Sequence, residues 1–254
     1  MNEVLGDEDL LRYSRHILLN EVDVEGVKRI RNSKILIVGV GGLGSIAALY
    51  LGASGVGEIS LVDDDKVDLT NLQRQVAFST QDIQENKAIA CQQAIQRINP
   101  AVIVKVYAER FTASLGAMVL PSVDAVLDCS DNFTTRHLVN RLCVQYKIPL
   151  VCGAAIRFDG QLTVFDARDG ENPCYECLFP DNNHSQDEAC ATMGVLSPLV
   201  GMIGSAQAIE TLKLLAGVGQ SLVGRLVLFN ALNCDTQTMH YRQDKNCKVC
   251  VKST

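Results

Sequence analysis

Four glycines near residue 40 have the spacing of a phosphate-binding loop. They are Gly39, Gly41, Gly42 and Gly44. They lie between an apolar run over 34–38 and a helical pattern over 45–54, which is the strand–turn–helix context that the G-x-G-x-x-G fingerprint requires. Glycines let the backbone approach a phosphate, and the N-terminus of the following helix offers unpaired N–H groups and a positive dipole end. The pattern therefore predicts a nucleotide site.

Polar side chains after the next apolar run could complete such a site. Asp63 follows the strand pattern over 58–62, about twenty residues after the glycines, where an acidic residue binds a nucleotide's ribose. Asp65 continues the acidic cluster. Farther along come two amides and two cations: Asn71, Gln75, Arg74 and Lys87. Two cations beside a glycine loop suit a polyphosphate, although their spacing alone fits ordinary surface cations equally well.

Asp131 follows the apolar run over 123–129. The carboxyl ends of parallel strands line the ligand crevice in open α/β sheets, so Asp131 is expected near the glycine loop. A carboxylate near a triphosphate most simply holds Mg²⁺. Asp131 could also be the N-cap of the helix predicted over 134–146, because aspartate favours that position, and the two roles are compatible.

Four cysteines form two Cys-x-x-Cys pairs that can supply four thiolates to a tetrahedral zinc ion. They are Cys174, Cys177, Cys247 and Cys250. Their separation exceeds the usual zinc-ribbon range, but such a site could attach the C-terminal tail to the body of the protein. All four ligand positions are filled, so we predict structural zinc. A further cysteine, Cys190, ends a polar segment, and its acidic neighbours Asp187 and Glu188 argue against a reactive thiolate.

The chemical residues lie on strands and helices that alternate along the chain. Strand patterns at 34–38, 58–62, 102–107, 123–129 and 148–152 are interspersed with helical patterns at 45–54, 86–97 and 134–146. This order predicts an α/β fold with a Rossmann-like, largely parallel sheet and helices on both faces. The segment 160–166 alternates like an antiparallel strand, which predicts an antiparallel extension of the sheet. Two short helices are expected before the first strand, over 9–20 and 25–31.

Composition limits the classes of function. The chain has 254 residues, 47% of them hydrophobic, with a net charge of −6, so a non-specific binder of nucleic acid or acidic membranes is unfavoured. The N-terminus lacks an apolar signal region, and polar residues interrupt the apolar segment 195–217, which predicts a buried helix rather than a membrane span. We therefore expect a cytoplasmic protein.

Taken in order, these motifs resemble those of the E1-like adenylyltransferases, which activate ubiquitin-like sulfur carriers and are the bacterial relatives of ubiquitin-activating enzymes. The matching stretches run from about Leu10 to Cys250: 12–15 (Arg-Tyr-Ser-Arg), the glycine loop, 63–65, 71–75, Lys87, 128–132 (Asp-Cys-Ser-Asp-Asn) and both cysteine pairs. The resemblance implies that ATP and Mg²⁺ bind at the glycine loop. A carrier's C-terminal Gly-Gly carboxylate would then attack the α-phosphorus, giving an acyl-adenylate and pyrophosphate.

The resemblance also implies roles for individual residues. Asp131 would hold Mg²⁺, Arg74 and Lys87 would stabilise the phosphates, and Asp63 would hold the ribose. The remaining nucleotide-binding residues would be Asp65, Asn71, Gln75 and Asn132. Arg15 would enter the site across a homodimer interface, as an arginine finger does in other phosphoryl transfers.

Within a single domain over 1–254, the resemblance implies three parts: N-terminal helices (1–32), an ATP-binding part (33–153) and a carrier-binding part (154–254). The last contains a crossover loop (178–195) and the zinc site. A cysteine near this loop forms a covalent link to the carrier in some family members, and a sulfur-donor protein is a further expected partner. The segment 153–161 resembles the molybdopterin-synthase branch, whereas residues 13–14, 63–65 and 178–182 resemble the thiamine branch. We expect the molybdopterin branch, with the thiamine branch as the alternative.

Three other functions stay open from the sequence. The glycine loop and Asp63 alone would suit a nicotinamide-dependent oxidoreductase, but nothing indicates a proton-relay residue, and that function leaves Arg74, Lys87 and Asp131 unused. A binding module that docks a carrier without activating it is a second alternative. An enzyme that adenylates a carboxylate on a modified tRNA base is a third, which the acidic balance disfavours.

Overall fold

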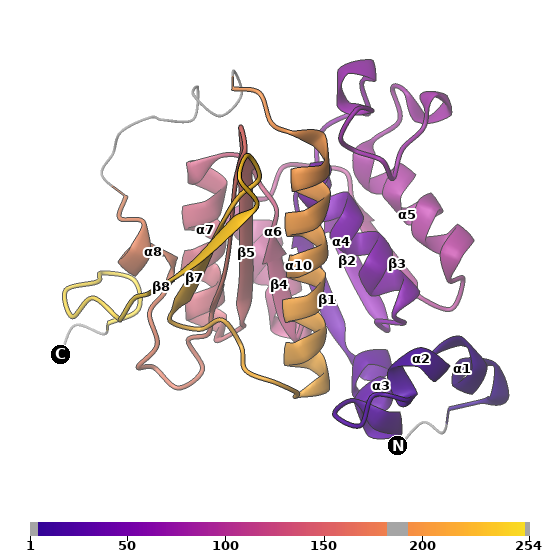
Figure 1. Cartoon of the computed structure of the whole chain (residues 1–254), viewed down its shortest axis with the longest axis horizontal. Helices are drawn as coiled ribbons and strands as arrows, with labels where there is room; N and C mark the ends of the chain where they lie inside the picture. The colour runs from indigo at the N-terminus through magenta and orange to yellow at the C-terminus, as the bar shows by residue number, and fades with distance from the viewer. Residues whose placement is uncertain (1–4, 182–192, 252–254) are drawn as a thin grey trace.

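The computed structural model describes residues 5–181 and 193–251, and an eight-stranded sheet runs through them (Figure 1). The strand order is β3-β2-β1-β4-β5-β6-β7-β8. Their bounds are β1 (Lys34–Val38), β2 (Glu58–Val62), β3 (Ile103–Tyr107), β4 (Ala125–Asp128), β5 (Leu150–Ile156), β6 (Asp159–Phe165), β7 (Arg225–Asn230) and β8 (Asp235–His240). Strands β1 to β5 pair in parallel and β6 to β8 pair antiparallel, so the predicted fold class is confirmed.

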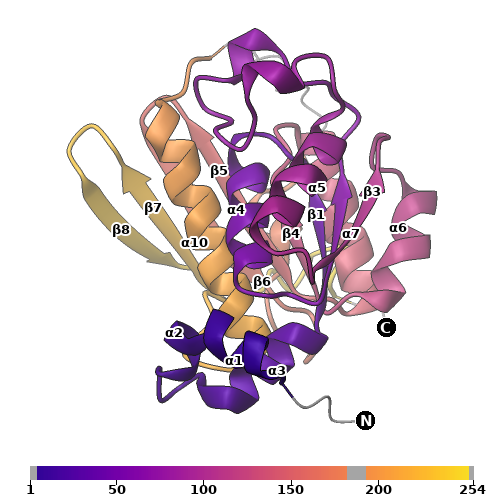
Figure 2. The same ribbon diagram turned by 90° about the vertical axis from the view of Figure 1, so that its right-hand side faces the viewer.

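Helices cover both faces of the sheet (Figures 1 and 2). Their bounds are α1 (Asp7–Arg12), α2 (Ser14–Ile17), α3 (Asp23–Asn32), α4 (Gly42–Ala53), α5 (Lys87–Ile98), α6 (Ala113–Val119), α7 (Phe133–Tyr146), α8 (Tyr175–Leu178) and α10 (Ser197–Ala216). Short 3-10 turns occupy Leu69–Asn71, Thr80–Asp82 and Leu120–Ser122. One face carries α4, α5 and α10, and the other carries α6 and α7.

Strand β1 shows why its sequence is apolar throughout. Ile35 and Ile37 belong to the core under α4, α5 and α10, whereas Leu36 and Val38 belong to the core under α6 and α7. Side chains alternate between the faces of a strand, so a central parallel strand with helices on both sides buries every residue. Each such side chain contributes roughly 1.5–3 kcal/mol through the hydrophobic effect.

Strands β1 and β4 are neighbours at the point where the order of strands in the sheet changes direction. Val38 at the end of β1 pairs with Asp128 at the end of β4. The chain leaves β1 towards β2 on one side and leaves β4 towards β5 on the other. The two outgoing loops therefore diverge above a crevice at the carboxyl ends of the strands, the usual ligand position in open α/β sheets. The glycine loop and Asp131 are thereby placed at the same edge of the sheet.

Several elements differ from their predicted extents. The predicted helix over 9–20 is divided into α1 and α2 at Tyr13, which is buried, its hydroxyl accepting a 2.9 Å hydrogen bond from the Asn99 side chain. Helix α6 was not predicted. Helix α10 is long and apolar enough to cross a membrane, but it packs against α4 and strands β5 and β6, as expected of a core helix.

Candidate nucleotide site and metal centre

The glycine loop packs directly against the loop that follows β4. Gly39 has a φ of +85°, and a side chain there would place its Cβ 2.8 Å from the Cys129 carbonyl oxygen. Gly44 lies in the first turn of α4, where a Cβ would overlap the Gly39 carbonyl oxygen. Both positions require glycine because the two loops and the helix N-terminus approach each other at backbone distance.

Asp63 joins the end of β2 to the glycine loop. Its Oδ2 accepts the Val40 N–H at 2.6 Å, and its Oδ1 accepts the Asp65 N–H at 2.8 Å. Burial raises the pKa of Asp63, and the two N–H groups and the Lys87 ammonium oppose this increase only in part. The carboxylate is therefore fixed at the end of the strand, where a ribose hydroxyl could replace or share one of its hydrogen bonds.

Lys87 is not an ordinary surface cation. Its side chain is only 8% exposed, and its ammonium lies 2.8 Å from the Asp65 carboxylate, which is 68% exposed. Asn86 caps α5 and donates hydrogen bonds to the backbone carbonyls of Asp63 and Asp65, so α5 and the acidic cluster form one unit. A phosphate group bound beside Lys87 would meet an ammonium that the exposed Asp65 carboxylate holds in position.

Arg74 and Gln75 lie on the segment between β2 and α5, and the Gln75 side chain approaches the glycine loop. The Arg74 guanidinium donates to the Thr70 carbonyl at 3.2 Å, and the Asn71 side chain contacts the Thr70 hydroxyl at 3.5 Å. Gln75 is 3% exposed, and its Nε2 lies 3.6 Å from the position of a Cβ on Gly41. Its Oε1 is buried with no hydrogen-bond partner among the described residues, a polar group that a bound ligand or water could satisfy.

Asp131 is exposed just beyond β4, and its carboxylate forms no hydrogen bond or ion pair within the described part of the chain. The prediction that it caps the next helix is wrong: Asn132 is the N-cap of α7 and accepts the Thr135 N–H at 2.8 Å. An unpaired carboxylate beside a phosphate loop fits Mg²⁺, which prefers oxygen ligands.

Arg15 does not lie with these residues in the same chain. It belongs to α2, which lies with α1 and α3 beyond the amino end of the sheet, whereas the glycine loop is at the carboxyl end (Figure 1). Within this chain, Arg15 and the glycine loop therefore lie at opposite ends of the sheet.

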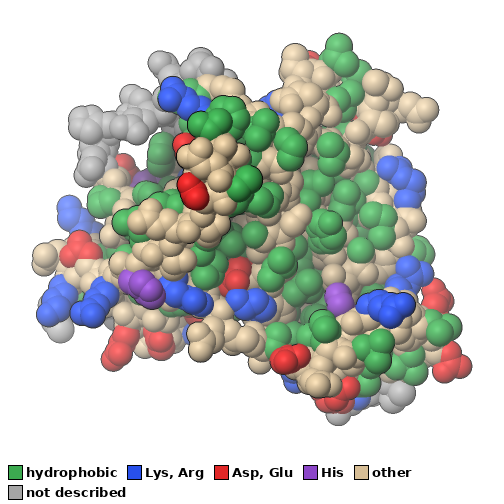
Figure 3. All heavy atoms as spheres, viewed as in Figure 1, with side chains coloured by type: hydrophobic (Ala, Val, Ile, Leu, Met, Phe, Trp, Pro, Cys, Tyr) green, Lys and Arg blue, Asp and Glu red, His purple; other side chains and the backbone are tan. Residues whose placement is uncertain are grey.

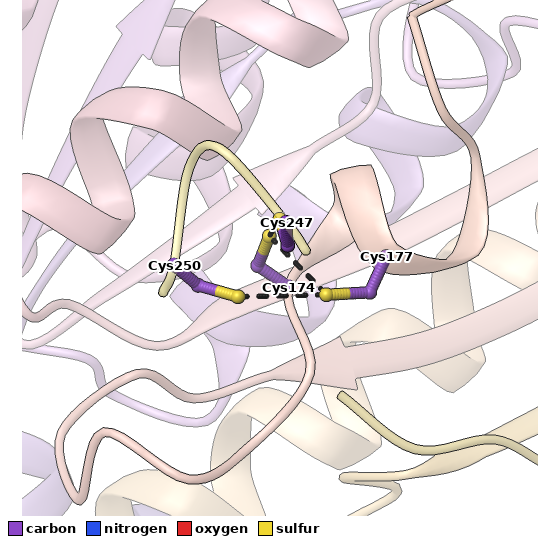
Figure 4. Close-up of side chains that lie close together, drawn as sticks. All are labelled: Cys174, Cys177, Cys247 and Cys250. Atoms are coloured by element: carbon purple, nitrogen blue, oxygen red, sulfur yellow. Dashed lines mark hydrogen bonds between the residues drawn. The ribbon is translucent and has the colours of Figure 1, made fainter. Parts of the chain in front are cut away.

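The four paired cysteines meet in one cluster (Figure 4). Their sulfur atoms lie 4.0 Å apart for Cys174 and Cys177, 3.7 Å for Cys174 and Cys247, and 3.4 Å for Cys177 and Cys250. Tetrahedral zinc with Zn–S bonds of about 2.3 Å places its sulfurs roughly 3.8 Å apart, so this set fits zinc. The cysteine cluster brings the C-terminal segment with Cys247 and Cys250 against the α8 region, as the sequence predicted.

Two side chains of helix α7 contact the residues around Cys174. Asn140 accepts the Tyr175 N–H at 3.0 Å and lies 3.7 Å from the Cys174 sulfur, and His137 contacts the Glu176 carboxylate at 2.8 Å. Such contacts orient metal ligands. Sequence reasoning missed these residues, and it also missed Arg136, Gln207 and Asn86. In the sequence, the feature that could have indicated these residues is a polar side chain on the apolar face of a predicted helix or at its N-cap.

The remaining described cysteines offer no nucleophile near the nucleotide site. Burial raises the pKa of Cys91 and Cys152 to about 12 and raises the pKa of Cys129 and Cys143 as well. Cys234 is exposed on the turn between β7 and β8. Cys190 lies outside the described residues.

Fold and site together define an α/β protein with a glycine loop at the carboxyl ends of its parallel strands and a cluster of four cysteines that fits a metal ion. A model of the ThiF family matches residues 13–249, and the chain belongs to this family. It is 43% identical over 250 residues to a molybdopterin-synthase adenylyltransferase of Escherichia coli K12, covering 97% of this chain and 98% of that protein. It is 40% identical over 246 residues to the sulfur carrier protein ThiS adenylyltransferase of the same organism, covering 97% of each.

Two further likenesses extend this picture. A SAMP-activating enzyme E1 of Haloferax volcanii is 44% identical over 240 residues, 94% of this chain and 88% of that protein. The crystal structure of Escherichia coli MccB with ATP superposes with a TM-score of 0.84 at 23% identity, covering 98% of this chain and 75% of that one, a likeness of fold. The two Escherichia coli relatives are named adenylyltransferases, and this chain is an enzyme of that type.

Proposed function

We propose that this protein uses ATP to adenylylate the C-terminal Gly-Gly carboxylate of a ubiquitin-like sulfur carrier, of the kind represented by the small subunit of molybdopterin synthase. The observation that carries the proposal is the convergence of the β1, β2 and β4 ends. It brings a glycine loop, the Asp63 carboxylate, the buried cation Lys87 and the unpaired Asp131 to one edge of the sheet.

These residues suit nucleotide transfer by positioning and charge neutralisation. A carboxylate oxygen of the carrier attacks the α-phosphorus, the bond to the β-phosphate oxygen breaks, and pyrophosphate leaves with the electron pair. Lys87 and Arg74 stabilise the phosphate charge, Asp63 and the glycine loop hold the nucleoside end, and Asn71, Gln75 and Asn132 line the site. Asp131 would hold Mg²⁺, which offsets phosphate charge when bound. No covalent enzyme intermediate is required for this step.

A homodimer would complete the site by bringing in Arg15 from the partner. Support comes from the exposed apolar side chains on α4 and α10, where Tyr50, Met202 and Ile209 are 57%, 38% and 58% exposed. Hydrophobic atoms gather over this face in Figure 3. The described cysteines are free, which suits a reducing compartment, and we place the reaction in the cytoplasm.

The test is ATP–pyrophosphate exchange with candidate carriers ending in Gly-Gly. We expect exchange that depends on the carrier and on Mg²⁺, and Asp131→Asn should lower its rate by roughly a hundredfold or more, because loss of a fixed charge-stabilising group has costs of this order. The exposed Glu171→Gln is the matched control and should keep full activity. An Asp131→Asn protein with normal exchange would refute the proposed cation role.

The carrier's pathway is tested in the same assay. The molybdopterin-type carrier should give a higher kcat/KM than the thiamine-type carrier, in line with the segment 153–161 and the molybdopterin-synthase relative. A higher kcat/KM with the thiamine-type carrier would assign the protein to that pathway instead, and binding of NAD without ATP would reject adenylylation altogether.

A further inference from the structure

A buried arginine holds the peptide that leads into Asp131. The Arg136 side chain lies on the first turns of α7 and is 8% exposed. Its Nη2 donates to the Ser130 carbonyl at 2.5 Å and to the Gly153 carbonyl on β5 at 3.1 Å. Its Nη1 lies 3.3 Å from the Cys152 sulfur and 3.9 Å from the Asp128 carboxylate. One side chain therefore connects the β4 loop, β5 and α7.

The other side of Ser130 is held by Asp128, which is fully buried at the end of β4. The Asp128 Oδ1 accepts the Ser130 N–H at 3.0 Å and its hydroxyl at 2.6 Å. From the opposite face, Gln207 on α10 donates to the Asp128 backbone carbonyl at 2.9 Å. Ser130, which directly precedes Asp131, is thus held through its N–H and hydroxyl by Asp128 and through its carbonyl by Arg136.

Asp131 is consequently constrained on both sides. The carbonyl that accepts from Arg136 belongs to the peptide group that joins Ser130 to Asp131. Because a peptide group is planar, this hydrogen bond also orients the N–H and Cα of Asp131. Immediately afterwards Asn132 is fixed by its cap bond to the Thr135 N–H. The exposed carboxylate itself has no partner in the described part of the chain, so these contacts fix the backbone position from which the Asp131 side chain extends.

A buried ion pair is a poor way to gain stability, because desolvation offsets most of its attraction. The hydrogen bonds of Arg136 also go to the backbone carbonyls of Ser130 in the loop and Gly153 on β5 rather than to the Asp128 carboxylate, which is the more distant group. We infer that Arg136 and Asp128 serve mainly to fix the backbone geometry of the loop that follows β4.

We propose that Arg136 is a positioning residue that presets Asp131 for the cation of a metal–nucleotide complex. This inference rests on the proposed function, since it assumes that Asp131 meets such a cation. Arg136 does not touch the nucleotide; it acts through the Ser130–Asp131 peptide. Outer-shell contacts of this kind change metal affinity by about 10–100-fold.

The test uses a pair of variants that keeps the buried charge balanced. In Arg136→Met with Asp128→Asn both charges are removed, while the side-chain amide oxygen at position 128 can still accept the Ser130 N–H and hydroxyl. Arg136→Lys, which keeps a charge but shortens the reach, is the second variant. Arg141→Met is the matched control, because Arg141 is exposed on the same helix. Paramagnetic Mn²⁺ binding in the presence of a non-hydrolysable ATP analogue is measured by electron paramagnetic resonance.

We expect both Arg136 variants to bind Mn²⁺ about tenfold more weakly, while nucleotide affinity without metal stays unchanged. The Mg²⁺ concentration for half-maximal exchange should rise by the same factor, and Arg141→Met should match the wild type in both. A merely structural role would lower Tm and leave the metal dependence unchanged. Wild-type Mn²⁺ affinity in a folded Arg136 variant overturns the inference. Absence of a metal–nucleotide complex in the wild type would overturn the proposed function itself.

Discussion

At the scale of single residues, Asp63 combines a raised pKa with two fixed hydrogen bonds. Burial is the main cause of the raised pKa, and the Val40 and Asp65 N–H groups and Lys87 counter it in part. Because the folded pKa exceeds the unfolded one, this carboxyl favours the folded state below its unfolded pKa. That contribution is lost as the pH rises through the raised folded pKa. Ionisation of this carboxyl therefore costs stability in the folded state, which suits a binding group rather than a structural one.

This shift predicts how ATP binding varies with pH. Protonation removes the charge that accepts ribose hydroxyls, so affinity should begin to fall at a higher pH than an ordinary carboxylate would cause. Isothermal titration of ATP over a pH series checks this. Asp63→Asn should bind more weakly at neutral pH, with less dependence on pH. An unchanged pH profile in that variant would show that another group is responsible.

At the scale of elements, the start of α4 is the most restricted part of the nucleotide site. Gly44 lies within helical backbone, where alanine is ordinarily favoured over glycine by roughly 1 kcal/mol. Here a Cβ would collide with the Gly39 carbonyl, whereas a Cβ on Gly41 would meet only the Gln75 amide nitrogen at 3.6 Å. The two glycines thus have different functions: one permits packing, and the other leaves room above the loop.

Two alanine variants separate these functions. Gly44→Ala should lower the free energy of unfolding by roughly 1–3 kcal/mol or more, because overpacked backbone must shift. Gly41→Ala should unfold like the wild type yet bind ATP more weakly, because its methyl group occupies space above the phosphate loop. Denaturant unfolding and ATP titration measure the two effects. A Gly44→Ala protein as stable as the wild type would contradict the observed packing.

The cysteine cluster is the second element with a testable function. We expect about one zinc ion per chain, bound by four thiolates. Cys247→Ser with Cys250→Ser should lose the metal, lower Tm and expose the C-terminal segment to protease. Cys234→Ser, at an exposed position outside the cluster, should do none of these. Metal analysis and limited proteolysis give the answer, and zinc retained by the double variant would rule out this ligand set.

At the scale of the whole molecule, the positions of α2 and the glycine loop at opposite ends of the sheet make a dimer testable by complementation. Arg15→Ala and Asp131→Asn should each be nearly inactive. Mixed after subunit exchange, they should regain about a quarter of wild-type exchange activity, because half of the dimers are mixed and each has one complete site.

A second mixture controls for non-specific recovery. Arg74→Ala and Asp131→Asn affect residues that belong to the same chain's site, so their mixed dimers contain no complete site and should stay inactive. Recovery in this control, or its absence in the first mixture, would show that Arg15 does not act across an interface.

The sequence by itself determined the strand–helix alternation, the glycine loop, the acidic residue after β2 and the two cysteine pairs. These features depend on local rules: side-chain period, turn chemistry and ligand spacing. It predicted the parallel sheet with its antiparallel extension for the same reason. It also placed Asp131 at a strand end, although it offered a helix-capping role that belongs to Asn132.

Only the tertiary structure decided which polar residues cooperate. Lys87 is buried against Asp65, Arg136 donates to the Gly153 carbonyl, and Asn140 reaches the Cys174 sulfur; each of these contacts joins different elements of the fold. Their geometry depends on strand order and helix packing, because neither residue type nor spacing fixes which distant groups meet. The division of the first predicted helix at Tyr13 has the same origin: burial of one aromatic ring against Asn99 outweighs a continuous helical pattern.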